Sequence, residues 1–87
     1  MPSNADINEL ILNVAKTIIF ELKLEDVTPE TFDPDLDLVD ELGIDSMDLT
    51  TVALVLQDDY EITIDEDDYP TLKNVRLIAE YINSKLN

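Results

Sequence analysis

The sequence predicts an all-α fold, a small bundle of three main helices plus one short helix, in a single domain over residues 1–87. Three observations support this prediction. Apolar residues recur at intervals of three and four in three separate stretches, as they do on one face of an α-helix. Ile62 and Ile64 alternate like a strand, but one short strand finds no partner in this chain. A chain of 87 residues also has room for only one modest core.

The first helix is expected from about Asn4 to Glu21, with Ser3 or Asn4 as its N-cap and Asp6 in its first turn. Its inward residues follow helical spacing and are Ile7, Leu10, Ile11, Val14 and Ile18. The next stretch, "LEDVTPETFDPDLDL", contains two prolines and no sustained period, so we expect a long loop there. The side chains expected to hold this loop on the core are Phe32, Leu36 and Leu38.

The second helix is expected from about Ser46 to Asp59, and its inward face comprises Leu49, Val52, Leu56 and Tyr60, with Ala53 and Val55 beside it. An extended link and one helical turn over about Glu66 to Tyr69 should follow, ended by Pro70. Thr71 is then expected to cap a last helix that runs to about Lys85. The inward residues of this last helix are Val75, Ile78, Ala79, Ile82 and Leu86.

The charge of the chain is strongly unbalanced. Its 21 acidic residues face five basic ones, which gives a net charge of −16. Between Glu25 and Asp68 there are 17 acids and no base. Such a surface repels the phosphates of nucleic acids, so we expect no nucleic-acid partner. It should instead be attracted to basic patches on partner proteins.

Two residue types are absent from the chain. Without cysteine, the chain has no disulfide, no thiolate nucleophile and no cysteine metal site. Without histidine, it lacks the usual general base and the commonest transition-metal ligand. We therefore expect no metal site and no catalysis. The start of the chain lacks the basic segment followed by an apolar core that is typical of a secretory signal. No apolar run approaches the roughly 20 residues that span a bilayer. The expectation is a cytoplasmic monomer without stable membrane insertion.

Ser46 stands out in "ELGIDSMDLTTVALVL", where a loop gives way to a helix. A serine nucleophile needs an adjacent base, and the nearest basic residues along the chain are Lys23 and Lys73. A structural role is the simplest reading, because either Asp45 or Ser46 could serve as the N-cap. Gly43, the one glycine in the chain, predicts a backbone turn with positive φ just before the helix. The exposed helix N-terminus that results is also a suitable place for a phosphate group.

The segment "LVDELGIDSMDL" from Leu38 to Leu49 resembles the modification site of acyl carrier proteins, in which a D-S-L core follows an acidic turn ending in glycine. "LQDDYEITIDEDD" (56–68) is similar to the end of that family's second helix and its acidic loop, and "LIAEYINSKLN" (77–87) to its last helix. The resemblance covers more than half of the chain. It implies the acyl-carrier-protein-like form of the helical bundle.

The resemblance implies that Ser46 is the attachment point of a covalent 4′-phosphopantetheine arm, taken from coenzyme A by a phosphopantetheinyl transferase. The thiol of the arm would carry acyl groups as thioesters, so the protein would serve separate enzymes and perform no catalysis itself. Those partners are acyl-transferring and biosynthetic enzymes with basic docking patches. The residues expected to meet them are Asp45, Met47, Asp48, Asp58 and Asp59. A candidate acyl pocket is formed by Val52, Ala53, Leu56, Ile62, Ile64 and Ala79.

The chain departs from the resemblance at a few positions. Thr51 and Gln57 stand where members that serve fatty-acid synthesis usually carry acids, and Met47 stands where leucine is usual. The loop around Phe32 and Pro34 is also longer. These departures favour a specialised lipid or polyketide pathway over primary fatty-acid synthesis.

Other readings stay open beside this one. The same fold could act as an unmodified acidic interaction module or as an aminoacyl or peptidyl carrier. A calcium loop is suggested by Asp33, Asp35, Asp37 and Asp40, but an EF-hand counted from Asp33 would need glycine and glutamate where Leu38 and Ile44 stand.

Overall fold

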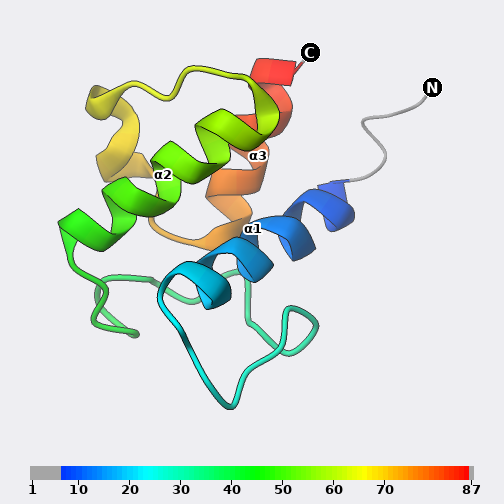
Figure 1. Cartoon of the computed structure of the whole chain (residues 1–87), viewed down its shortest axis with the longest axis vertical. Helices are drawn as coiled ribbons and strands as arrows, with labels where there is room; N and C mark the ends of the chain where they lie inside the picture. The colour runs from blue at the N-terminus through cyan, green and yellow to red at the C-terminus, as the bar shows by residue number, and fades with distance from the viewer. Residues whose placement is uncertain (1–6, 87) are drawn as a thin grey trace.

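A computed structural model describes residues 7–86, and within them it contains three α-helices, one short 3-10 helix and no strand. The helices are α1 (Ile7–Glu21), α2 (Ser46–Tyr60), η2 (Glu66–Thr71) and α3 (Val75–Leu86). The all-α prediction is therefore confirmed. In Figure 1 the long loop between α1 and α2 runs below α1, while η2 and the links on either side of it join α2 to α3. The expected helix start at Asn4, with its N-cap and Asp6, lies outside the described residues.

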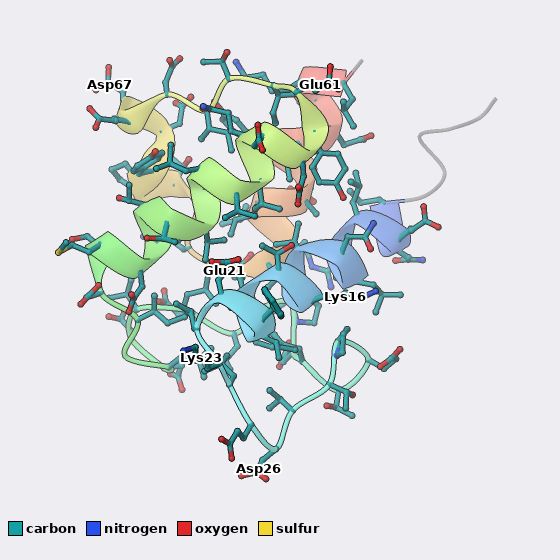
Figure 2. The ribbon with its side chains drawn as sticks, viewed as in Figure 1. Lys16, Glu21, Lys23, Asp26, Glu61 and Asp67 are labelled. Atoms are coloured by element: carbon teal, nitrogen blue, oxygen red, sulfur yellow. The ribbon has the colours of Figure 1, made fainter. Side chains whose placement is uncertain are left out.

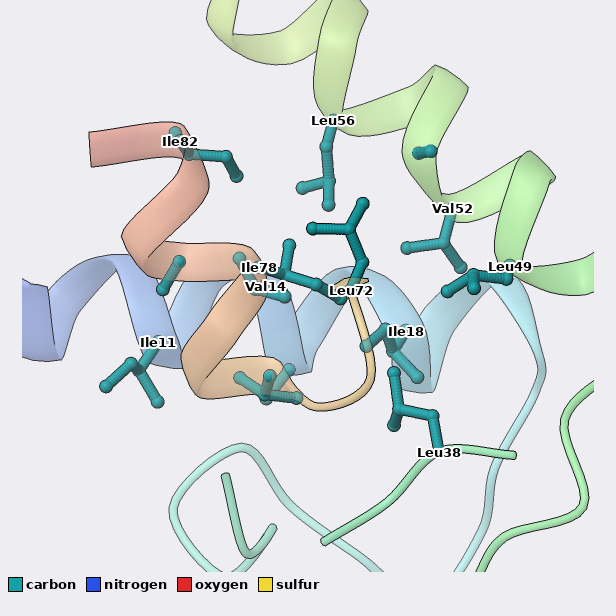
Figure 3. Packing of buried hydrophobic residues seen from close by; sticks show 14 of the residues in the cluster. Ile11, Val14, Ile18, Leu38, Leu49, Val52, Leu56, Leu72, Ile78 and Ile82 are labelled. Atoms are coloured by element: carbon teal, nitrogen blue, oxygen red, sulfur yellow. The ribbon is translucent and has the colours of Figure 1, made fainter. Parts of the chain in front are cut away.

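The core lies where the apolar faces of the three α-helices meet. α1 packs against both α2 and α3. Figure 3 shows side chains of all three helices, together with Leu38 and Leu72 from the links, directed into one shared space. The inward faces predicted for α1 and α2 are buried at Leu10, Ile11, Val14, Ile18, Leu49, Val52, Ala53 and Leu56. One apolar stripe on each helix supplies most of the core, and the loop and links complete it with Phe32, Leu38, Ile44, Ile64 and Leu72.

The inward face of α3 is confirmed at four of its five predicted positions, Val75, Ile78, Ala79 and Ile82. The prediction for Leu86 is wrong, because 51% of its surface remains exposed at the end of the helix. The predicted cap is also wrong. Asn74 caps α3 through its Oδ1, which accepts a hydrogen bond from Leu77 N at 2.8 Å. Thr71 instead donates its hydroxyl to the carbonyl of Asp68 inside η2. Pro70 lies within η2 rather than ending it.

The long loop is held on α3 at its middle. Arg76 N donates to the carbonyl of Pro34 at 3.0 Å, and Leu38 N donates to the carbonyl of Lys73 at 2.8 Å. The Arg76 guanidinium also forms a salt bridge with Asp35, with Nε at 2.6 Å from Oδ1. Of the three residues predicted to fix the loop, Phe32 and Leu38 are buried and Leu36 is half-buried. The loop therefore forms one wall of the molecule, next to the start of α2.

Candidate functional site

The start of α2 leaves the Ser46 hydroxyl free. Asp45 is the N-cap, with φ −87° and ψ 172°, and its Oδ1 accepts a hydrogen bond from Asp48 N at 2.9 Å. Its carbonyl accepts the next hydrogen bond, from Leu49 N at 3.1 Å. Ser46 is the first residue of α2, its side chain is exposed, and its hydroxyl makes no hydrogen bond within residues 7–86. Of the two candidate caps, Asp45 therefore does the capping.

A tight turn precedes α2 and sets the direction in which the helix starts. Asp37 Oδ1 accepts hydrogen bonds from the backbone N–H groups of Val39 and Asp40, at 3.0 and 2.8 Å. Gly43 closes this turn by donating its N–H to the carbonyl of Val39 at 3.0 Å. Its φ of +70° confirms the predicted positive value, a conformation that costs glycine little. The chain thus folds back just before Ser46 and leaves that residue exposed.

A groove of about 430 Å³ opens beside Ser46. Its apolar lining comes from the loop, from α2 and from the η2 region, and consists of Val39, Leu49, Tyr69, Pro70 and Leu72. Its polar lining consists of Asp37, Asp40, Ser46 and Lys73. Sequence reasoning did not place Tyr69, Pro70 or Lys73 at the site. They belong to or follow η2, which the chain reaches only after the whole of α2.

The η2 wall of this groove is tied to α3. The hydroxyl of Tyr81 donates a hydrogen bond to Asp68 Oδ2 at 2.7 Å. This hydrogen bond, together with partial desolvation, raises the pKa of the Tyr81 phenol above its ordinary value. A phenol is protonated at neutral pH even at its ordinary pKa of about 10, so Tyr81 donates this hydrogen bond there and links η2 to α3.

The five residues predicted to dock partners are all exposed, but they lie at two ends of α2. Asp45, Met47 and Asp48 lie next to Ser46 along the chain, and Met47 is 78% exposed. Asp58 and Asp59 lie in the last turn, about 18 Å along the helix from Ser46 at a rise of about 1.5 Å per residue. Between the two ends α2 presents Leu54, which is 52% exposed and which the sequence analysis did not select.

The predicted acyl-pocket residues lie inside the molecule. Five of them are buried in the core, namely Val52, Ala53, Leu56, Ile64 and Ala79, while Ile62 is half-buried. None of the six lines the groove beside Ser46. Leu49 and Leu72 connect the two regions, because both line the groove and both belong to the core cluster. An acyl pocket at the six residues stays a prediction, and opening one would require these side chains to separate.

Two positions that depart from the family pattern have internal hydrogen bonds. Gln57 Oε1 accepts a hydrogen bond from Ile64 N at 2.9 Å and so fixes the link that follows α2. The hydroxyl of Thr51 donates to the carbonyl of Met47 at 3.1 Å. The middle of α2 is therefore uncharged at both positions, and Gln57 is also a structural residue.

Three acids of the long loop have partners within the protein. Asp33 accepts a hydrogen bond from Asp35 N, Asp35 pairs with Arg76, and Asp37 caps the turn before α2. Within residues 7–86 the fold brings together no group of three or more acidic side chains suited to holding a metal ion. Over the same residues, no helix has the length and apolar character needed to cross a bilayer.

Fold and site together define a class of protein, the small helical domains that carry a phosphopantetheine group. The family model described as "Phosphopantetheine attachment site" matches residues 17–82, which include both the groove and Ser46. The chain belongs to the acyl carrier protein family. It is 39% identical over 70 residues to the acyl carrier protein of Desulforapulum autotrophicum, an alignment that covers 80% of this chain and 90% of the relative.

Two further relatives extend the comparison over most of the chain. The acyl carrier protein of Streptomyces coelicolor is 30% identical over 82 residues, covering 94% of this chain and 87% of the relative. A solved structure of the acyl carrier protein from Enterococcus faecalis superposes with a TM-score of 0.73 at 25% identity, covering 91% of this chain and 96% of that one. The arrangement of helices in Figure 1 is thus the fold of this family.

Membership of this family implies a covalently attached 4′-phosphopantetheine prosthetic group. The residues at the start of α2 fit such a group. The hydroxyl of Ser46 is exposed and has no hydrogen-bond partner among residues 7–86, and the groove beside it has apolar walls of the kind that suit an extended arm. When bound, the group supplies the thiol that a chain without cysteine lacks.

Proposed function

We propose that Ser46 accepts the phosphopantetheine arm and that the protein carries acyl groups as thioesters on the thiol of this arm. One observation carries the proposal: Ser46 is an exposed hydroxyl at the first residue of α2, not used for capping and adjacent to a groove. A serine placed here as the N-cap would accept a hydrogen bond from a backbone N–H of the first turn. Asp45 performs that function here and leaves Ser46 available for modification.

The protein contributes the hydroxyl, and we propose that its partner enzymes contribute the catalysis. In the modification, the Ser46 oxygen would form a phosphoester bond while the pyrophosphate bond of coenzyme A breaks and its adenosine 3′,5′-bisphosphate half leaves, and the serine proton would pass to a base on the transferase. The chain contains no histidine to accept that proton, and the turn before α2 is surrounded by acids that already serve as caps. A non-catalytic role agrees with this arrangement.

We further propose that partner enzymes approach along the exposed side of α2. Asp45 and Asp48 would attract basic side chains, and Met47 would supply an apolar contact beside the attachment point. Asp58 and Asp59 would act at the other end of the same helix. The distance between the two ends suits a partner that covers the whole length of α2.

The uncharged middle of α2 supports a specialised lipid or polyketide pathway. Thr51 and Gln57 leave a neutral gap between the two acidic ends. In the variant Thr51→Glu with Gln57→Glu, the second substitution keeps a carboxylate oxygen able to accept from Ile64 N. We expect this variant to be loaded faster than wild type by an acyltransferase of fatty-acid synthesis at low salt, and less so at high salt. Equal rates at both salt concentrations would remove the gap as a source of specificity.

Arm attachment is tested by intact mass. We expect incubation with coenzyme A and a broad-specificity phosphopantetheinyl transferase to add the mass of one arm to the wild-type protein. Ser46→Ala should add none, whereas the control Ser84→Ala, at an exposed position of α3, should behave like wild type. An unchanged mass of wild type with two unrelated transferases would contradict the proposal, as would an arm on the Ser46→Ala variant.

A further inference from the structure

The groove beside Ser46 contains one basic side chain among the residues that the structure describes, that of Lys73. Two acids, Asp37 and Asp40, line the same groove. Lys73 is exposed and forms no ion pair with either of them, since the salt bridge found within residues 7–86 joins Arg76 to Asp35. Asp37 Oδ1 is directed at two backbone N–H groups of its own turn. The Lys73 ammonium therefore lies in the groove without an ion-pair partner in the part of the chain that the structure describes.

The backbone of Lys73 is held in place on both sides. Its carbonyl accepts the hydrogen bond from Leu38 N at 2.8 Å, which joins it to the opposite wall of the groove. The preceding residue, Leu72, is 3% exposed and anchored in the core, and the following residue, Asn74, caps α3. The flexible part is thus the side chain alone, and it starts from a fixed point at the edge of the groove.

The side chains around Ser46 are mostly acidic, and Lys73 is placed to offset their repulsion of a phosphodiester. A phosphodiester on the Ser46 oxygen would add a negative charge next to Asp45 and Asp48 on α2 and across from the two acids of the groove. Like charges within a screening length of about 8 Å at physiological salt repel one another. Unless a cation approaches, the arm would be pushed away from the protein surface. Lys73 is the cation that lines the same groove.

We propose that Lys73 is a positioning residue that pairs with the phosphodiester of the arm on Ser46 and holds the first part of the arm over the groove. This proposal rests on the proposed function, in which Ser46 carries the arm. It assigns Lys73 no part in the attachment reaction, and it predicts that unmodified and arm-bearing protein respond differently to loss of the lysine charge.

The test compares both forms of four proteins: wild type, Lys73→Gln, Lys73→Arg and the control Lys16→Gln. Lys16 is exposed on α1 (Figure 2) and lines a different groove, beside Asp59 and Tyr60 at the end of α2 remote from Ser46. Intact mass first establishes that each protein carries one arm. The phosphorus NMR shift of the arm and the melting temperatures of both forms are then measured at about 10 mM and about 0.5 M sodium chloride.

At low salt we expect Lys73→Gln to change the phosphorus shift of the arm and to lower the melting temperature of the arm-bearing form by about 1–5 °C more than that of the unmodified form. Lys73→Arg should keep the phosphorus shift and the melting temperatures near those of wild type. Lys16→Gln should leave the phosphorus shift unchanged and should affect the melting temperatures of the two forms equally. High salt should reduce the changes caused by Lys73→Gln. A phosphorus shift identical to wild type, or equal melting changes in both forms, would overturn the proposal. Absence of the arm from wild type would instead refute the proposed function.

Discussion

The division of roles between Asp45 and Ser46 leads to a prediction that separates capping from modification. Substitution of Asp45 by alanine removes the hydrogen bond from Asp48 N to Asp45 Oδ1, which measures 2.9 Å. Loss of an N-cap of this kind typically costs about 1 kcal/mol. A loss of about 1 kcal/mol lowers the melting temperature of a domain of this size by about 4–8 °C.

Ser46→Ala is expected to behave in the opposite way. The hydroxyl makes no hydrogen bond within residues 7–86, so its removal costs no internal interaction. Alanine is also a better helix former than serine. We therefore expect the stability of the Ser46→Ala variant to equal or slightly exceed that of the unmodified wild type, although the variant should no longer accept the arm.

The measurement is thermal and urea unfolding of unmodified proteins at one salt concentration. Asp45→Asn serves as the control, because asparagine caps about as well as aspartate while removing the charge. We expect Asp45→Asn to stay near wild type and Asp45→Ala to fall below it. A Ser46→Ala variant as unstable as Asp45→Ala would refute the reasoning, since it would mean that the serine hydroxyl supports the helix in solution.

The remaining predictions concern the loop and the overall charge. Gly43→Ala should lower the free energy of unfolding in urea by about 1–2 kcal/mol, because alanine disfavours a φ of +70°, and Gly43→Asn should lower it less. A Cβ at this position meets no atom within 4 Å, so the loss would come from the backbone conformation alone. An alanine variant as stable as wild type would contradict the turn. The hydrogen bonds from Arg76 hold the pKa of Asp35 below its ordinary value, so the salt bridge stabilises the folded protein above a pH of about 4, and this contribution is lost as the pH falls through the lowered pKa. Arg76→Gln should therefore be less stable than wild type at pH 7, and the two should converge in acid; a difference that does not change with pH would exclude the salt bridge as its cause. The melting temperature of wild type should rise with salt or with divalent cations, because 17 acids lie between Glu25 and Asp68 without a base, and an unchanged melting temperature would show that their repulsion is already relieved.

The helices could be predicted because their evidence is local. Each buried stripe repeats at intervals of three and four, so the apolar positions of α1 and α2 determine both the element and its inward face. Gly43 was equally informative, since a positive φ favours glycine over every other residue. The D-S motif at Asp45 and Ser46 likewise marks the start of α2.

Other features depend on contacts between distant parts of the chain. Thr71 and Asn74 are both residue types that cap helices, and the choice between them is decided by how η2 packs, with Thr71 bonded to Asp68. Similarly, Tyr69 and Lys73 follow α2 in sequence but form the wall opposite its first turn. The structural role of Gln57 could not be predicted, because its partner, Ile64 N, lies beyond the turn that ends α2.

The backbone of Leu38 connects three parts of the molecule. Its N–H donates to the carbonyl of Lys73, and its own carbonyl accepts from Ile44 N at 3.0 Å, one residue before the cap of α2. Together with the bond from Arg76 to Pro34, these contacts join the middle of the long loop to α3 as one mechanical unit. Widening of the groove between this unit and α2 would leave these hydrogen bonds in place, so we expect slow amide exchange at Leu38 and Arg76 in both forms of the protein.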